Sequence, residues 1–163
     1  MDCTIRFTVP LQRAAEARAP TQHERAAHEF EIPEALTGLS VLLVEDNAFN
    51  QQVVTEMLSD AGIEVNTASN GLEALRWLNT QRPDVVLMDM HMPRLSGLET
   101  LRRIRELPKQ PPCILISAAW DSELREAAMQ ESAFSVLPKP VSPTQLTGVV
   151  RDALRTVYNW DPK

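Results

Sequence analysis

Five short apolar runs, each followed by a segment of helical periodicity, dominate the sequence from residue 40 to residue 157. Apolar runs of this length between helices are typical of buried parallel strands joined by right-handed crossovers. The second and fifth runs contain polar residues, which indicates strands at the two edges of the sheet. We therefore predict an α/β domain with a flavodoxin-like, doubly wound sheet of five parallel strands in the order 2-1-3-4-5, covered by five helices. The runs lie at residues 41–44, 63–67, 85–88, 113–116 and 134–137.

Capping residues mark where several of these helices begin. A Ser or Asn side chain can accept a hydrogen bond from the amide three residues later, and a Glu or Gln at that later position can return one. This spacing predicts helices after residues 70, 96 and 142. The helix expected over residues 48–61 is amphipathic, with one face packing on the sheet. The capping pairs are Asn70 with Glu73, Ser96 with Glu99 and Ser142 with Gln145, and the amphipathic face comprises Phe49, Val53, Met57 and Leu58.

Composition narrows the class of protein. The chain has 163 residues and a formal net charge of −6, whereas nucleic-acid-binding domains normally carry a basic patch, so we predict no nucleic-acid partner. No apolar stretch approaches the roughly 20 residues that span a bilayer, and no signal-peptide pattern opens the sequence. Cys3 and Cys113 are far apart and show no disulfide or metal-ligand spacing. These features predict a cytoplasmic chain in a reducing compartment, without direct membrane contact.

The chain divides into segments of different composition. Residues 1–11 contain an alternating apolar pattern that predicts one short strand, ended by Pro10. Residues 12–38 are rich in Ala, Glu, Arg and Gln and poor in large apolar residues, which is typical of a linker. Residues 39–159 carry the repeated strand and helix pattern and form the predicted domain, and residues 160–163 form a tail.

Three carboxylates follow two of the predicted strands. Glu45 and Asp46 come directly after the first apolar run, and Asp89 follows the third. Because these strands are neighbours in the predicted order, their carboxyl ends place the three acids together at the topological switch point, where such sheets bind ligands. Close carboxylates repel one another unless a cation lies between them, and Mg²⁺ prefers such oxygen ligands. We therefore predict a Mg²⁺ site; the alternative for Asp46, or for its neighbour Asn47, is a helix N-cap.

A hydroxyl and an ammonium group follow the next two strands. Ser117 comes after the fourth run, and Lys139 lies between two prolines after the fifth, where the proline rings restrict the backbone. Taken alone, Ser117 would be a strand-end serine bonded to local backbone, and a lysine at a strand end is usually solvated. Together with the acids, the set suits phosphoryl transfer: Asp89 is the nucleophile, and the cation, Lys139 and Ser117 stabilise the phosphoryl oxygens.

Five motifs, taken in order, resemble the receiver domain of response regulators and hybrid sensor histidine kinases over residues 40–157. The first motif and the motif around Asp89 are most similar to receivers fused to hybrid sensor kinases. The resemblance implies two-component signalling, in which the domain accepts a phosphoryl group from a phosphohistidine in a Mg²⁺-dependent reaction. The motifs are VLLVEDNAFNQ, SNGLEAL, DVVLMDMHMPRLSGLE, ILISA and LPKPV.

The resemblance also implies a role for each candidate residue. Asp89 would be the phospho-acceptor, and Ser117 and Lys139 would contact the phosphoryl group. The peptide bond between Lys139 and Pro140 would be cis. The implied metal ligands are Asp46, Asp89, Glu45 through water and the backbone carbonyl of His91.

Proteins that carry a phosphorylated histidine are the implied partners: the phosphodonor domain of a histidine kinase, a histidine phosphotransfer domain, or both. The receiver would catalyse its own phosphorylation and dephosphorylation, and a full-length parent would be a histidine kinase that an inner-membrane segment could anchor. Residues 2–11, DCTIRFTVPL, resemble the last strand of a histidine-kinase ATP-binding domain. The alternative is an unrelated amino-terminal extension.

One position departs from the pattern of this family. Receivers usually carry an aromatic switch residue three positions before the lysine, and Val136 stands there. Aromatic rotation therefore cannot relay a signal in this chain, which leaves open a receiver-fold interaction module that does not depend on phosphorylation. A metal phosphatase is disfavoured, because His91 stands where its second aspartate, two residues after the nucleophile, would be.

Overall fold

The structure is a computed structural model that describes residues 36–118 and 122–160. The strand expected within residues 1–11, and the expected linker as far as residue 35, lie outside the described residues. Leu36 is fully buried in the core, and the amide of Gly38 donates a hydrogen bond to the carbonyl of Gly62 at 3.0 Å. The chain is therefore already packed against the domain before its first strand begins.

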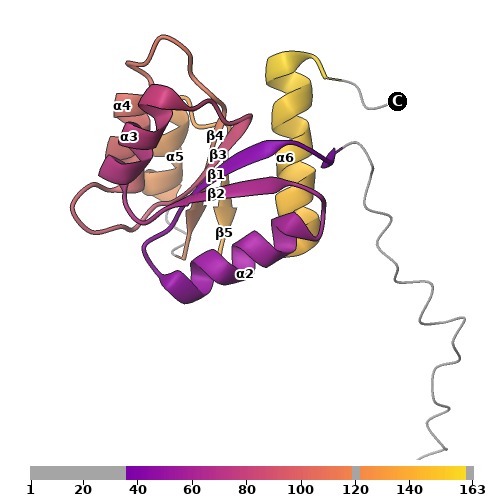
Figure 1. Cartoon of the computed structure of the whole chain (residues 1–163). Helices are drawn as coiled ribbons and strands as arrows, with labels where there is room; N and C mark the ends of the chain where they lie inside the picture. The colour runs from indigo at the N-terminus through magenta and orange to yellow at the C-terminus, as the bar shows by residue number, and fades with distance from the viewer. Residues whose placement is uncertain (1–35, 119–121, 161–163) are drawn as a thin grey trace, which may run out of the picture. The chain divides into compact units, whose positions relative to one another are not determined.

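Five parallel strands form one sheet in the order β2-β1-β3-β4-β5 (Figure 1). The edge positions of β2 and β5 agree with the polar residues in the second and fifth apolar runs. The predicted flavodoxin-like order is confirmed. The strands are β1 (Ser40–Val44), β2 (Glu64–Ala68), β3 (Val85–Asp89), β4 (Cys113–Ser117) and β5 (Ser135–Pro138).

Helices cover both faces of this sheet. Figure 1 shows α2 and α6 on one face and α3, α4 and α5 on the other, as right-handed crossovers in a doubly wound sheet require. None of the helices in residues 36–118 and 122–160 has the length and apolar content needed to cross a membrane. The helices are α2 (Ala48–Ser59), α3 (Gly71–Thr80), α4 (Gly97–Ile104), α5 (Ser122–Gln130) and α6 (Pro143–Tyr158).

Strand residues alternate between two apolar layers. In β1, Val41 and Leu43 belong to the layer formed with α2 and α6, whereas Leu42 and Val44 belong to the layer formed with α3 and α4. β3 and β4 are buried along their whole lengths, because helices cover both of their faces. Burying each such aliphatic side chain contributes about 1.5–3 kcal/mol. The central strands are therefore a rigid frame for the residues at their carboxyl ends.

The predicted helix caps are present. The side chains of Asn70, Ser96 and Ser142 each accept a hydrogen bond from the amide three residues later, at distances of 2.9, 3.2 and 3.2 Å. Ser142 also forms a full capping box with Gln145. The Lys139–Pro140 peptide bond is cis, as the family resemblance implied.

Helix α2 packs on the sheet through only part of the face that its periodicity predicted, and Leu58 is buried as expected. Val54 and Leu58 are buried, whereas Val53 and Met57 are only half-buried and Phe49 is 73% exposed. The prediction that Phe49 packs on the sheet was wrong. The reason is its place in the first turn of α2, at the level of the carboxyl ends of the strands, where the helix has not yet reached the body of the sheet.

Gly97, the first residue of α4, lies directly against the end of β3. A Cβ atom at this position would lie 2.5 Å from the carbonyl oxygen of Asp89 and 2.9 Å from the Cα of Met90. We expect Gly97→Ala to lower the free energy of unfolding, measured in urea, by about 1–3 kcal/mol, because the backbone it meets is fixed in the sheet.

Gly148 is the matched control, since it lies inside α6 and a Cβ there would meet no atom within 4 Å. Gly148→Ala should raise the free energy of unfolding by about 0.5–1 kcal/mol. A Gly97→Ala variant as stable as the parent chain would contradict the close packing of α4 on β3.

Candidate functional site

Four neighbouring strands bring polar or charged side chains to the same edge of the sheet. Val44 pairs with Met88 in the register, so the residue after each of them also stands side by side. Asp89 in turn lies beside Ile116. The residues that meet at this edge are therefore Glu45 after β1, Asp89 at the end of β3, Ser117 at the end of β4 and Lys139 after β5.

The three predicted acids come together in a compact cluster. One carboxylate oxygen from each of Glu45, Asp46 and Asp89 lies within 4.8 Å of the others. Opposite ligands of an octahedral Mg²⁺ ion are roughly 4.2 Å apart, so this spacing is compatible with one ion that the acids hold directly or through water. Glu45 is 4% exposed and Asp89 is 6% exposed, whereas Asp46 is exposed, which leaves the cluster open to solvent on one side.

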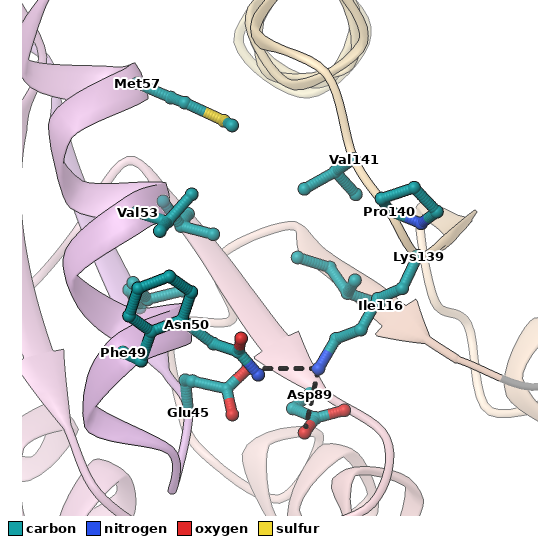
Figure 2. Close-up of a pocket in the computed structure, with 12 residues that line it drawn as sticks. Glu45, Phe49, Asn50, Val53, Met57, Asp89, Ile116, Lys139, Pro140 and Val141 are labelled. Atoms are coloured by element: carbon teal, nitrogen blue, oxygen red, sulfur yellow. Dashed lines mark hydrogen bonds and ion pairs between the residues drawn. The ribbon is translucent and has the colours of Figure 1, made fainter.

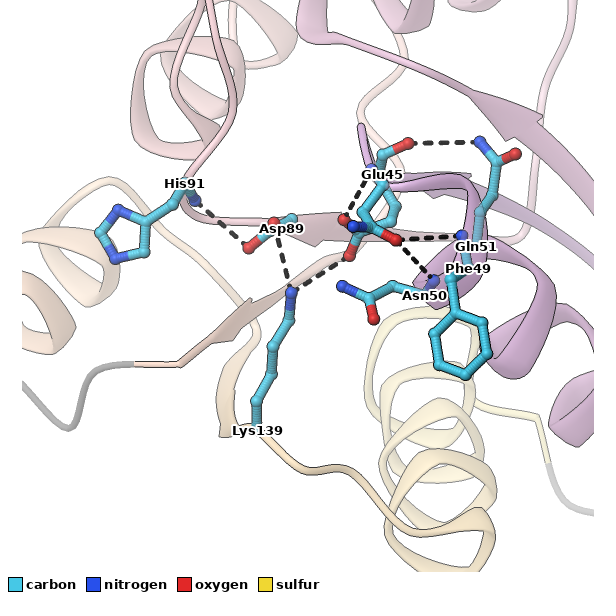
Figure 3. Close-up of polar contacts among 8 residues, drawn as sticks. Glu45, Phe49, Asn50, Gln51, Asp89, His91 and Lys139 are labelled. Atoms are coloured by element: carbon cyan, nitrogen blue, oxygen red, sulfur yellow. Dashed lines mark hydrogen bonds and ion pairs between the residues drawn. The ribbon is translucent and has the colours of Figure 1, made fainter.

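Lys139 joins the two buried carboxylates of this cluster. Its Nζ lies 3.1 Å from Oε2 of Glu45 and 3.3 Å from Oδ2 of Asp89, as Figure 3 shows. Burial by itself lowers the pKa of Lys139. The charge of Asp89, followed by hydrogen bonding and charge from Glu45, outweighs burial, so the pKa of Lys139 is raised above its ordinary value. The ammonium group is therefore charged at neutral pH and is aimed into the site.

Backbone and amide groups fix the two carboxylates that Lys139 contacts. The amide of Asn47 donates to Oε1 of Glu45 at 3.1 Å, and the side chain of Gln51 donates to the carbonyl oxygen of Glu45 at 3.2 Å. The amide of His91 donates to Oδ1 of Asp89 at 3.2 Å. Each carboxylate thus has one oxygen held by the backbone and the other by Lys139.

Asn47, not Asp46, is the N-cap of α2. Its Oδ1 accepts hydrogen bonds from the amides of Phe49 and Asn50 at 3.0 and 3.1 Å. The N-cap is therefore the neutral residue of this neighbouring pair. The carboxylate of Asp46 is therefore not used for capping and remains within the acid cluster.

Ser117 and His91 are the two remaining residues of the predicted site. Ser117 is 3% exposed, and its carbonyl oxygen accepts a hydrogen bond from the Lys139 amide at 2.8 Å, which ties the ends of β4 and β5 together. His91 is exposed, and Figure 3 shows its imidazole turned away from Lys139. The predicted role of the His91 carbonyl as a metal ligand stays a prediction.

A cavity of about 400 Å³ opens beside the acids, between α2 and the segment after β5 (Figure 2). Its walls are mainly apolar, and one end reaches Glu45, Asp89 and Lys139. The sequence did not predict this cavity. The sequence feature that could have indicated it is the four-residue spacing of Phe49, Val53 and Met57. These residues form an apolar stripe beside the buried positions of α2. The apolar walls comprise Phe49, Val53, Met57, Ile116, Pro140 and Val141.

Comparison with known proteins gives a consistent result. Residues 41–151 match the family described as response regulator receiver domain. A receiver domain protein from Clostridium thermocellum has a similar structure, with a TM-score of 0.70 and 32% identity, covering 74% of this chain and 98% of that one. The receiver domain of a sensor histidine kinase from Pseudomonas aeruginosa PAO1, whose structure has a magnesium ion coordinated in the active site cleft, gives a TM-score of 0.68 and 32% identity, covering 72% and 98%.

Several matches to curated proteins cover only part of a longer chain. A protein-glutamate methylesterase/protein-glutamine glutaminase of Hahella chejuensis is 35% identical over 125 residues, which is 73% of this chain and 36% of that protein. A response regulatory protein of Vibrio cholerae is matched over 49% of its length. The chain therefore spans between a third and a half of the length of these relatives.

Lys139→Met should lower the free energy of unfolding at pH 7 by roughly 1–3 kcal/mol, because the buried Glu45 and Asp89 would lose their shared cation. A raised pKa in the folded state means that the stabilisation is complete below pH 10.5 and is lost as the pH rises through the folded-state pKa. Urea unfolding of parent and variant should therefore differ equally at pH 7 and pH 9, and the difference should shrink above pH 10.5. The exposed Lys109→Met is the control, and its free energy of unfolding at pH 7 should match that of the parent chain. A difference unchanged at pH 11 would argue against these ion pairs.

Proposed function

The chain belongs to the response regulator receiver domain family of two-component signalling, and from this premise we propose that Asp89 accepts a phosphoryl group from a phosphohistidine in a Mg²⁺-dependent reaction. The observation that carries the proposal is the contact of one ammonium group with two buried carboxylates, next to a third, exposed one. Such a site surrounds a nucleophilic carboxylate with two further acids. Its ammonium group can interact with the negative charge of an incoming phosphoryl group.

Asp89 is the nucleophile in this proposal. One carboxylate oxygen attacks the phosphorus of the donor N-phosphoimidazole, an O–P bond forms, and the N–P bond breaks. The electron pair of the broken bond stays on the imidazole nitrogen, which then takes up a proton. Lys139 and the hydroxyl of Ser117 stabilise the transferred oxygens, because both groups lie at the same sheet edge as Asp89.

The acid cluster fits the metal that this chemistry uses. Asp46 and Asp89 would hold Mg²⁺ directly, Glu45 would hold it through water, and the carbonyl of His91 would complete the protein ligands. When bound, the ion neutralises charge on the phosphoryl oxygens. The exposed position of Asp46 supports the proposal, since a hydrated ion can reach this side of the cluster.

The cavity beside Asp89 supports a docking site for the phosphodonor. A donor imidazole must approach Asp89 from solvent, and the protein that carries it needs an apolar surface close by. Phe49 is exposed, lies in the first turn of α2 and lines this cavity, so we place the donor, a histidine kinase or histidine phosphotransfer domain, against α2 and the segment after Lys139.

A hybrid sensor kinase is the proposed setting of the domain. In this proposal residues 39–159 are the receiver, residues 12–38 the linker, and residues 1–11 the last strand of an ATP-binding domain. The motifs VEDNAFNQ and MDMHMPRLSG support it, as does the structural similarity to the receiver of a sensor histidine kinase.

Val136 favours a second candidate, an interaction module whose output does not depend on phosphorylation. Its side chain is half-buried and packs against the apolar layer beneath α3, α4 and α5, where it has no ring to rotate. Beryllofluoride, a phosphoryl mimic, separates the two candidates. Binding with no change in the backbone amide spectrum outside the site would favour the second.

Asp89→Asn should abolish Mg²⁺-dependent labelling by acetyl phosphate while leaving urea unfolding cooperative, since the amide cannot act as nucleophile. Asp46→Asn should retain the nucleophile but require at least tenfold more Mg²⁺ for half-maximal labelling, because a direct charged ligand is lost. Asp152→Asn, on the exposed surface of α6, should behave as the parent. Full labelling of a folded Asp89→Asn variant would disprove the proposed acceptor.

Phe49→Ala should slow phosphoryl transfer from a phosphorylated histidine domain about tenfold, because removing an apolar anchor at an interface costs about 1.4 kcal/mol. Labelling by acetyl phosphate, which needs no docking, should be unchanged. Met129→Ala removes a side chain that is 49% exposed on α5 and serves as control. Equal transfer rates for Phe49→Ala and the parent would place the docking surface elsewhere.

A further inference from the structure

Asn50 places a carboxamide beside the acids, and no interaction described so far involves this group. The residue lies in the first turn of α2, is half-buried and lines the cavity together with Glu45, Asp89 and Lys139. Its backbone amide is used by the cap of α2. Within residues 36–118 and 122–160, the carboxamide itself makes no hydrogen bond.

The carboxamide is directed at the ion pair between Glu45 and Lys139. Figures 2 and 3 view the site from different sides, and in both the end of the Asn50 side chain lies next to this pair. The other residues of α2 that line the cavity are apolar: Phe49, Val53, Val54 and Met57. Asn50 is therefore the one polar residue that α2 contributes to the cavity wall, and it lies at the end next to the acids.

The ammonium group of Lys139 has three N–H donors, which is fewer than the acceptor oxygens that the phosphorylated site would offer it. It now contacts Glu45 and Asp89, and in the proposed reaction it must also contact the oxygens added to Asp89. When it turns toward those oxygens, Oε2 of Glu45 loses its charged donor. Oε1 keeps the amide of Asn47, but Glu45 is 4% exposed, so bulk water has little access to replace the lost contact. Glu45 would then keep the Asn47 amide and any water on Mg²⁺, and the loss of its charged donor disfavours the state in which it occurs.

We propose that Asn50 is a positioning residue that replaces Lys139 on Glu45 when the site is phosphorylated. Its Nδ2 donates a hydrogen bond to Oε2 of Glu45, which frees Lys139 for the phosphoryl oxygens and favours the phosphorylated state. The inference rests on the proposed function, and it assigns Asn50 a role after the phosphoryl group has arrived, not in binding the donor protein or the metal.

Beryllofluoride affinity at saturating Mg²⁺, measured by calorimetry, tests this role. Asn50→Leu keeps the size of the side chain and removes the donor, and it should weaken beryllofluoride binding about five- to tenfold while changing Mg²⁺ affinity less than twofold. Gln52→Leu is the matched control, because it removes an exposed carboxamide from the same helix, where the Gln52 side chain donates a hydrogen bond to Glu56. The control should bind beryllofluoride as the parent does.

A double-mutant cycle with Glu45→Gln shows whether the carboxamide acts through Glu45. In the Glu45→Gln background, the effect of Asn50→Leu should fall below twofold, because the charged acceptor is gone. An unchanged effect in that background, or a parallel loss of Mg²⁺ affinity in Asn50→Leu, would overturn the proposal. A loss seen only in transfer from a protein donor would assign Asn50 to docking instead, and would equally overturn it.

The carboxamide can also be observed directly in the parent chain, which keeps the test valid if Asn50→Leu does not fold. Its side-chain NH₂ resonances should shift downfield when beryllofluoride binds, and should not shift in Glu45→Gln. Absence of this shift in a parent chain that binds beryllofluoride would refute the role of Asn50 alone. Absence of Mg²⁺-dependent beryllofluoride binding by the parent would instead refute the proposed function.

Discussion

Two carboxylates buried side by side at the end of a parallel sheet are the constraint around which the domain is arranged. Glu45 and Asp89 cannot be brought together in a dry environment without a positive charge, and Lys139 supplies it from the neighbouring edge of the sheet. The rest of the fold keeps these three groups in place: buried central strands fix the acids, and the backbone bond from Lys139 to Ser117 fixes the lysine. The positive charge of Lys139 thus offsets the charges of Glu45 and Asp89, and a charged ligand that enters the site changes these interactions.

The capping of α2 shows how neighbouring residues divide their tasks. Had Asp46 capped the helix, its charge would have been partly satisfied by backbone amides and drawn away from the cluster. The neutral side chain of Asn47 does this work, and its own amide holds Glu45. One polar residue therefore both starts the helix and orients an acid, and the exposed carboxylate is kept available for a cation.

Much of this arrangement could be predicted from the sequence, because strand ends in a doubly wound sheet converge wherever the apolar runs stop. The positions of Asp89 and Lys139 followed from that rule alone. The exposure of Phe49 and the cavity did not, since helical periodicity tells which residues share a face but not where the helix passes the end of the sheet. The direction of the Asn50 carboxamide likewise depends on where the first turn of α2 lies relative to the strand ends, and no local sequence pattern encodes that position.

The close packing of α4 on the end of β3 links the positions of these two elements. Gly97 touches the backbone of Asp89 and Met90 with no space between them, and its amide is bonded to the Met90 carbonyl at 3.0 Å. No free space therefore separates the end of β3 from the start of α4. A displacement of the Asp89 backbone toward α4 would therefore press on the first turn of that helix, which would have to shift in turn.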